Sequence, residues 1–258
     1  MSFQSIEHLH RARFNSASSC EFLDFYEQAL DDTILAEEED TPGRTFAPSQ
    51  IRCKRISWFR LRGVAPEKEV VVNKTMNFTA QIGTACHQTI QDILSKKLGT
   101  DWVDVADYMK SAGLPYKYSC YKQGFETRVE IIEPVPIKFA PDGIIFWKGQ
   151  YWLLEIKTSD YSSFEKLTDI KPQHLDQVRC YCTLLRLRNA LVLYQDRVNG
   201  TFKCYEVKIT DADMKQVWAM FNEVQDAVAK NIPPAKLPKG DIWCTPSRCR
   251  YFNKCKEW

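Results

Sequence analysis

Apolar residues recur at helical spacing in three segments of the chain. Between residues 79 and 98 they form one stripe, and Gly99 follows as a stop signal. A second helix is expected near residues 172 to 188. A third follows Thr210, a residue type that commonly caps helices, and ends at Pro233-Pro234. These segments predict the main helices of the fold.

Apolar runs also predict five strands, near residues 126 to 132, 137 to 146, 150 to 157, 190 to 195 and 201 to 208. The turn signals Lys148-Gly149-Gln150 and Asn199-Gly200 indicate two antiparallel hairpins. The order is helix, three strands, helix, two strands, helix, with no internal repeat. It predicts an α/β core with a mixed central sheet flanked by helices.

The N-terminal region has a different pattern. Residues 1 to 48 contain one expected helix near residues 18 to 37, an acidic run from Glu37 to Asp40, and the loop signal Thr41-Pro42-Gly43. We therefore expect an N-terminal appendage over residues 1–48 and one large domain over residues 49–258.

A basic and aromatic run, IRCKRISWFRLRG, begins at Ile51 and is expected to be a short helix or a hooked loop. Arg52, Lys54 and Arg55 could contact phosphates while Trp58 stacks on bases, which would make the run a DNA-binding surface. An amphipathic core helix with solvated arginines is an equally open interpretation.

Composition narrows the class of protein. The chain has 258 residues, 44% of them hydrophobic, which is enough for a substantial core. Its apolar runs are far shorter than the roughly 18 to 20 residues that cross a bilayer, and its first residues lack the apolar stretch of a secretory signal. We therefore expect a cytoplasmic protein with no membrane partner. The net charge of +2 gives no overall attraction to nucleic acid, so local clusters must hold any anionic partner.

Two carboxylates and a lysine form the candidate site. Asp142 lies in Pro141-Asp142-Gly143, and Glu155 and Lys157 follow on a neighbouring strand. Because side chains alternate along a strand, Glu155 and Lys157 share one face and Ile156 takes the other. Paired carboxylates and the Ile156 carbonyl suit Mg²⁺ or Mn²⁺, and Lys157 could stabilise developing negative charge. Charged residues at an exposed strand edge are the alternative, although these strands are otherwise apolar.

The pattern P-D-x12-E-x-K resembles the PD-(D/E)XK nuclease superfamily, and the resemblance implies a restriction-endonuclease-like fold. The segment from Gly83 to His87 resembles the histidine motif of the RecB-like nucleases. Gln173, Gln177 and Tyr181 form one stripe on the helix near 172 to 188 and resemble the Q-x3-Y motif of the same group.

The resemblance implies roles for individual residues. One set would hold one or two Mg²⁺ or Mn²⁺ ions: His87, Asp142, Glu155 and the carbonyl of Ile156. Lys157 would polarise the attacking water or stabilise the phosphate. Gln177 and Tyr181 would orient the substrate or Lys157, and Glu126 or Glu130 would be an accessory acid.

Ten cysteines in a chain of this kind are expected to be thiols or metal ligands. Cys53 stands far upstream of Cys244, Cys249 and Cys255, a layout that resembles the AddB-type nucleases and the iron-sulfur exonucleases of the fourth CRISPR-associated protein family. The resemblance implies a [4Fe-4S] cluster in a C-terminal cysteine-rich tail. Four residues separate Cys244 from Cys249 where the family usually has two, so zinc and unliganded thiols stay open as alternatives. The other cysteines are expected to be core or incidental residues.

We therefore expect a metal-dependent DNA exonuclease that acts on single strands or DNA ends in recombination, repair or end processing. The alternative is a DNA-binding or assembly subunit that does not cut, and that serves a helicase or a CRISPR adaptation complex. A sequence-specific restriction endonuclease fits the late cysteines less well. A homo-oligomer is compatible with each of these.

Overall fold

The computed structural model describes residues 21–22, 25–26, 28–29, 32, 43–67, 74–246 and 248–258. The described residues before residue 33 are helical, while the rest of the helix expected near 18–37 and the acidic run after it lie outside the described residues. Phe46 falls within the expected appendage, yet it is fully buried against Phe221 and pairs with Ile137. The packed core thus begins before residue 48, and the appendage itself stays a prediction.

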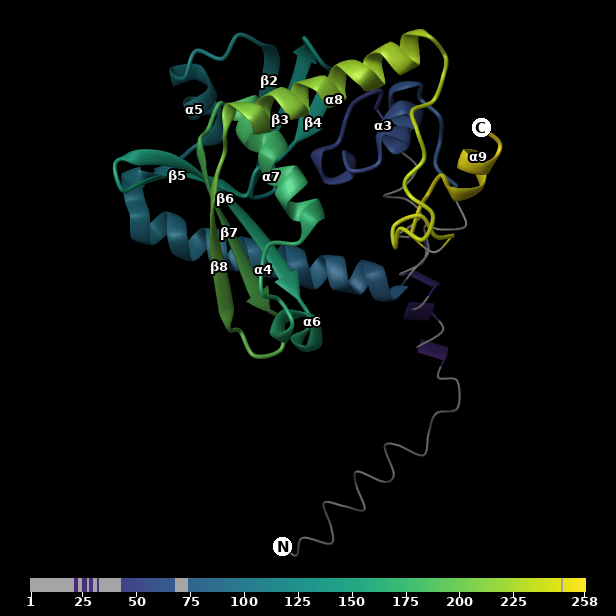
Figure 1. Ribbon diagram of the computed structural model, residues 1–258. Coiled ribbons are helices and arrows are strands. Elements are labelled where there is room, and N and C mark those ends of the chain that lie inside the picture. Colours follow the sequence, from purple (N-terminus) through teal and green to yellow (C-terminus); the bar gives the residue numbers. More distant parts are fainter. Residues whose placement is uncertain are drawn as a thin grey trace, which may run out of the picture.

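The described chain forms two sheets with helices around them (Figure 1). The large sheet has the strand order β1-β5-β6-β7-β8, and the small sheet has the order β2-β3-β4. The strands are β1 (Trp102–Val103), β2 (Lys117–Gln123), β3 (Glu126–Glu133), β4 (Ile137–Phe139), β5 (Gly143–Trp147), β6 (Gln150–Ser159), β7 (Asn189–Asp196) and β8 (Phe202–Lys208). The helices are α3 (Lys54–Leu61), α4 (Lys74–Leu98), α5 (Val105–Ser111), α6 (Tyr161–Glu165), α7 (Pro172–Leu185), α8 (Asp211–Ala229) and α9 (Phe252–Lys256), with short 3-10 turns η1 (Pro48–Gln50) and η3 (Gly99–Asp101).

The large sheet is mixed, as expected. Strands β6 and β7 are parallel, whereas β5 and β6 form an antiparallel hairpin and β7 and β8 form another. Helix α4 covers one face, where Ile90 packs on Leu154 and Ile156 of β6. Leu153 points the opposite way, into the main core that includes Val178 of α7, and Figure 1 shows α4 and α7 on the two sides of the sheet. This alternation is what sends Glu155 toward α7.

The single strand expected over residues 137–146 is two strands. Strand β4 belongs to the small sheet and β5 to the large one, so Ala140, Pro141 and Asp142 form the crossing between them. Pro141 has no N–H to donate to a ladder. A side chain at Gly143 would meet the Trp102 ring at 2.7 Å. The break places Asp142 where the two sheets meet.

The other long elements lie close to their predicted limits, and Thr210 forms a capping box with Asp213 at the start of α8. Several short elements have no counterpart in the sequence prediction: β1, β2, α5, α6 and α9. Strand β2 has the largely polar and exposed sequence KYSCYKQ, so its hydrophobic signal is weak. Among the described residues, no helix is long and apolar enough to cross a membrane.

The basic and aromatic run forms α3 and belongs to the core. Trp58 is 0% exposed and Phe59 is buried beside it. The C-terminal tail covers both side chains: Tyr251 stacks on Phe59 with ring centroids 5.1 Å apart, and Trp258 contacts Trp58 edge-on at 5.3 Å. Figure 1 shows the tail, in yellow, beside α3.

Candidate active site

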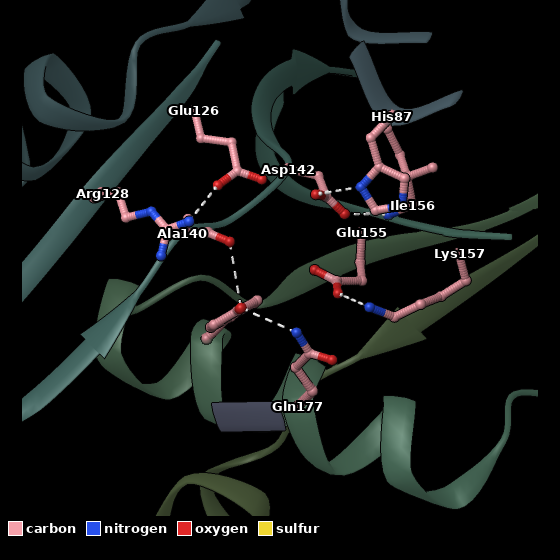
Figure 2. A network of polar contacts seen from close by, with 10 residues as sticks. His87, Glu126, Arg128, Ala140, Asp142, Glu155, Ile156, Lys157 and Gln177 are labelled. Atoms are coloured by element: carbon pink, nitrogen blue, oxygen red, sulfur yellow. Dashed lines mark hydrogen bonds and ion pairs between the residues drawn. The ribbon is translucent and has the colours of Figure 1, made fainter. Parts of the chain in front are cut away.

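Asp142 is held between a helix and a strand (Figure 2). Its Oδ1 lies 3.0 Å from Nδ1 of His87 on α4, and its Oδ2 accepts the backbone N–H of Ile156 at 2.6 Å. Pairing between β5 and β6 ends at Gly143 and Leu154, so the Asp142 carboxylate takes the place of the next strand partner for Ile156. Burial lowers the pKa of His87, but the hydrogen bond and charge of Asp142 outweigh this and raise it above its usual value.

Glu155 and Lys157 contact each other on the face of β6 that looks toward α7 (Figure 2). The Lys157 ammonium donates to Glu155 Oε1. Glu155 is 1% exposed, and burial raises its pKa although Lys157 opposes the shift. Burial also disfavours the charge on Lys157, yet Glu155 and Asp142 outweigh it and raise the lysine pKa. Each charge therefore depends on its buried neighbours.

One carboxylate oxygen of the site has no hydrogen-bond partner in the described part of the chain. Glu155 Oε2 is buried and accepts no hydrogen bond from the described residues. An unpaired buried acceptor normally costs about 1–3 kcal/mol, so such atoms call for an explanation. A cation at this oxygen would remove the cost. Hard divalent cations prefer the carboxylate and carbonyl oxygens that Asp142, Glu155 and Ile156 offer, so these residues fit Mg²⁺ or Mn²⁺ by their donor chemistry.

The ligand set is not closed around one point in this conformation. Within the described ranges, no group of three or more His, Cys, Asp or Glu side chains is arranged to hold a metal ion. His87 contacts Asp142, while Glu155 contacts Lys157. The fold thus brings the predicted ligands to one junction through pairwise contacts.

Gln177 and Tyr181 contact the backbone at the crossing between β4 and β5. In the described part of the chain, neither forms a hydrogen bond with Lys157. The Gln177 amide donates to the Tyr181 hydroxyl at 3.0 Å, and that hydroxyl donates to the Ala140 carbonyl at 3.3 Å. Tyr181 also stacks on Phe139, with ring centroids 5.4 Å apart. The hydroxyl fixes the backbone two residues before Asp142, so both residues position the carboxylate through the main chain. Gln173, the first member of the predicted stripe, lines a different pocket.

The two candidate accessory acids, Glu126 and Glu130, lie in different surroundings. Glu126 accepts from Arg128 at 3.2 Å (Figure 2) and lines a cavity of about 120 Å³ together with Asp142. Glu130 pairs with Lys138 at 3.3 Å on the small sheet. Only Glu126 shares a cavity with the site.

Gln91 is a site residue that sequence analysis missed. It lines the same cavity as Asp142, it is buried, and its Nε2 has no hydrogen-bond partner among the described residues. Its spacing of four residues from His87 on α4 places the two on one helical face. That spacing was the available signal.

Cys53, Cys244, Cys249 and Cys255 line one pocket, here called the cysteine pocket. Burial raises the pKa of Cys53, and it raises the pKa of Cys249 to about 11; the other thiols add to both shifts. All four are free thiols. Four sulfur donors line one pocket, and thiolates are suitable ligands for an iron-sulfur cluster or zinc. Among the described residues, however, no three of these thiols are arranged around one point.

The remaining cysteines have separate surroundings. Cys180 and Cys182 are buried in the main core, as expected for structural thiols, and Cys204 is exposed. Cys86 and Cys120 are half-buried on α4 and β2. Cys20 lies outside the described residues.

The predicted DNA-binding run requires a correction. Trp58 is buried and donates its indole N–H to the Ala227 carbonyl at 3.1 Å, so its ring is not available to a base. Arg55 is buried and donates to backbone carbonyls of the C-terminal segment, at 2.6 Å for Pro234. Arg52 and Lys54 lie nearer the surface and form ion pairs. The local pattern matched two interpretations, and tertiary packing selects the core helix.

Comparison with known proteins gives a fold and no family. No protein-family model matches the chain, and no curated protein matches its sequence. The crystal structure of SSO0001 is similar, with a TM-score of 0.52 and 16% identity over 92% of this chain and 98% of that chain. LHK-Exo, an alkaline exonuclease from Laribacter hongkongensis, gives a TM-score of 0.46 with 14% identity, over 76% of this chain and 93% of that chain. The structure of LHK-Exo in complex with dAMP gives a TM-score of 0.44 with 14% identity, over 73% of this chain and 89% of that chain. The similarity to SSO0001 shows a shared overall fold.

Proposed function

We propose that the protein is a metal-dependent nuclease that hydrolyses phosphodiester bonds of DNA, as an exonuclease acting on single strands or ends. The observation that carries this proposal concerns Glu155, which lies beside Lys157 and next to the Asp142 carboxylate. Its buried Oε2 has no hydrogen-bond partner among the described residues. The motif resemblance to PD-(D/E)XK nucleases and the mixed sheet that presents the motif support the same conclusion.

Individual residues have distinct tasks in this proposal. Asp142, Glu155, His87 and the Ile156 carbonyl would hold Mg²⁺ or Mn²⁺. When bound, the ion supplies a Lewis acid for the phosphate and a lowered pKa for the attacking water. Lys157 keeps its charge through Glu155, so it can stabilise negative charge on the phosphate as that charge develops.

Gln177 and Tyr181 are positioning residues in this proposal. Through the Ala140 carbonyl they hold the crossing between β4 and β5 that aims Asp142. Glu126 lies close enough to serve as an accessory acid, because it shares a cavity with Asp142.

We also propose that the cysteine pocket binds a [4Fe-4S] cluster, with zinc as the alternative. A bound cluster would join Cys53, just before α3, to the C-terminal tail. Tail and α3 already contact through aromatic pairs. The bound cluster or zinc would therefore cross-link these two segments in a reducing cytoplasm, where a disulfide would not persist.

A non-cleaving DNA-binding or assembly subunit is the second candidate, one that would serve a helicase, a recombination complex or a CRISPR adaptation complex. The contact between Lys157 and Glu155 favours it, because it occupies one of the expected metal-binding oxygens. If this candidate holds, the site would bind a strand without hydrolysis.

The test compares wild type with Glu155→Gln, which keeps the side-chain size and removes the charge. Anaerobically purified protein is incubated with Mn²⁺ and linear single strands labelled at either the 5′ or the 3′ end, with a circular strand as control. We expect stepwise release from one end by wild type, no cutting of the circle, and a loss of roughly 100-fold or more in the variant. A wild type that binds strands and never cuts them would support the second candidate.

A further inference from the structure

A second pocket lies where α3, the first turn of α7 and the C-terminal tail meet. Its volume is about 320 Å³, within the range of small-molecule sites. Four arginines line it, and we call it the arginine pocket: Arg52, Arg60, Arg248 and Arg250. None of the described residues that line it is an aspartate or a glutamate.

Arg52 and Arg60 have acceptor groups nearby. Arg52 has Asp176 at 3.7 Å and Asp241 at 3.6 Å. Arg60 donates its Nε–H to the Thr45 carbonyl at 3.2 Å. Burial lowers the pKa of Arg60, Tyr251 opposes the shift, and Arg250 lowers it further. Arg60 is half-buried, and the other three arginines are exposed. An anion stabilises like charges that lie close together. Guanidinium groups match the geometry of phosphate.

A flat apolar surface lies beside these charges. Trp243 lines the arginine pocket and is 40% exposed, with the Arg248 guanidinium 5.5 Å from its ring centroid. Tyr251 forms another wall, but its ring is stacked on Phe59 and its hydroxyl donates to the Val64 carbonyl at 3.2 Å. Trp243 is therefore the ring that can accept a planar group.

The pocket is close to the active site along α7. Gln173 lines it and lies four residues before Gln177, which holds the Tyr181 hydroxyl. Four residues of helix correspond to a rise of about 6 Å. The arginine pocket also shares Cys53 and Trp243 with the cysteine pocket. A strand that leaves the active site along the start of α7 would reach the arginines.

We propose that the arginine pocket binds one nucleotide unit of a single-stranded nucleic acid, with its phosphate on Arg60 and Arg250 and its base stacked on Trp243. A free nucleotide offers the same phosphate and base. Choosing a strand over a free nucleotide rests on the proposed nuclease function. In this proposal Trp243 performs the stacking that the sequence suggested for Trp58.

The test measures binding without cleavage. Full-length protein, purified anaerobically, is titrated in EDTA against a fluorescently labelled oligothymidylate, and binding is followed by anisotropy. Trp243→Leu removes the aromatic face and keeps apolar bulk, so we expect about tenfold weaker binding. Trp243→Phe should stay within about threefold of wild type. Trp147→Leu is the matched control, because Trp147 is 44% exposed on β5, and it should bind as wild type does.

A second variant tests the charge. Arg250→Gln should reduce the slope of log affinity against log salt by about 0.7, the value for one phosphate contact on a single strand. Circular dichroism and iron content show whether each variant folds as wild type does. Equal binding by Trp243→Leu and Trp147→Leu, or no binding of the strand by wild type, would overturn the proposal.

Thymidine monophosphate separates the two sources of the ligand. Tight binding of the monophosphate that depends on Trp243, with no Trp243-dependent binding of the strand, would overturn the assignment to a nucleic acid chain. Because no step requires hydrolysis, the pocket and the nuclease can fail independently. If the wild type binds the strand but never cuts it, and Trp243→Leu weakens that binding, the proposed pocket stands and the proposed nuclease function is wrong.

Discussion

The backbone N–H of Ile156 donates to the Asp142 carboxylate at 2.6 Å, at the point where pairing between β5 and β6 stops. A side chain thus replaces a strand as hydrogen-bond acceptor. The same carboxylate reaches His87 through its other oxygen. One residue therefore joins the edge of the hairpin to α4, and it does so beside the buried Glu155.

Asp142→Asn should separate this structural role from the chemical one. The amide oxygen can still accept from Ile156, so we expect the free energy of unfolding to change by no more than about 1 kcal/mol. Loss of the negative charge should reduce Mn²⁺-dependent cleavage roughly 100-fold or more. Asp142→Ala should in addition lose about 1–3 kcal/mol of stability, because the Ile156 N–H loses its acceptor. Urea unfolding and end-labelled digestion measure the two effects, and wild-type cleavage by Asp142→Asn would contradict the assignment.

Tyr181→Phe removes the hydroxyl that links Gln177 to the Ala140 carbonyl. We expect a stability loss of about 1–3 kcal/mol, since the buried Gln177 amide and the half-buried Ala140 carbonyl lose their partner. We also expect a severalfold lower kcat with little change in KM, because Asp142 is aimed less well.

Tyr108→Phe is the matched control for that prediction. Its hydroxyl donates to the Leu185 carbonyl at 3.0 Å in the core, away from Asp142. It should cost similar stability and leave cleavage unchanged. Equal loss of cleavage in both variants would show that Tyr181 acts only through stability.

His174 should make folding sensitive to acid. Burial lowers its pKa to about 3, with help from the charges of Lys157 and Lys171, and its Nδ1 lies 2.7 Å from the Tyr194 hydroxyl. The unfolded chain binds the proton near pH 6.5 and the folded chain does not, so stability falls as pH decreases from about 6.5 toward 3. At pH 5 the loss from this residue is up to about 2 kcal/mol.

Urea unfolding of wild type and His174→Gln at pH 7.5 and pH 5 tests this dependence. The wild type should lose more stability between the two conditions than the variant does. If both lose the same amount, His174 does not titrate in this way.

If the cysteine pocket binds the proposed cluster or zinc, Cys53→Ser should release it. Cys53 lines it with the three late cysteines, so one ligand of four is lost. We expect less iron and sulfide per chain, or less zinc if that is the metal, and faster hydrogen exchange in the C-terminal tail. Cys204→Ser, at an exposed cysteine on β8, is the control and should keep the full metal content. An unchanged metal content in Cys53→Ser would contradict the proposed ligand set.

The long helices and strands were predictable because their signals are local. A stripe of apolar residues at helical spacing indicates α4, and a capping residue marks the start of α8 at Thr210. Alternation along β6 likewise separates Glu155 from Ile156 within one strand. The short polar strand β2 was missed, since its stability comes from pairing with β3 and not from a pattern of its own.

By itself, the sequence determined most of the long elements and the set of chemically suited residues, because spacing along one helix or strand is enough to place side chains on a common face. Only the tertiary structure decided how these residues meet. Whether Trp58 faces a base or the core depends on the C-terminal tail, two hundred residues away. The break between β4 and β5, the bond from Ile156 to Asp142, and the gathering of Arg60 with Arg248 all depend on contacts between distant segments. Such contacts are set by packing and loop closure, which no local pattern encodes.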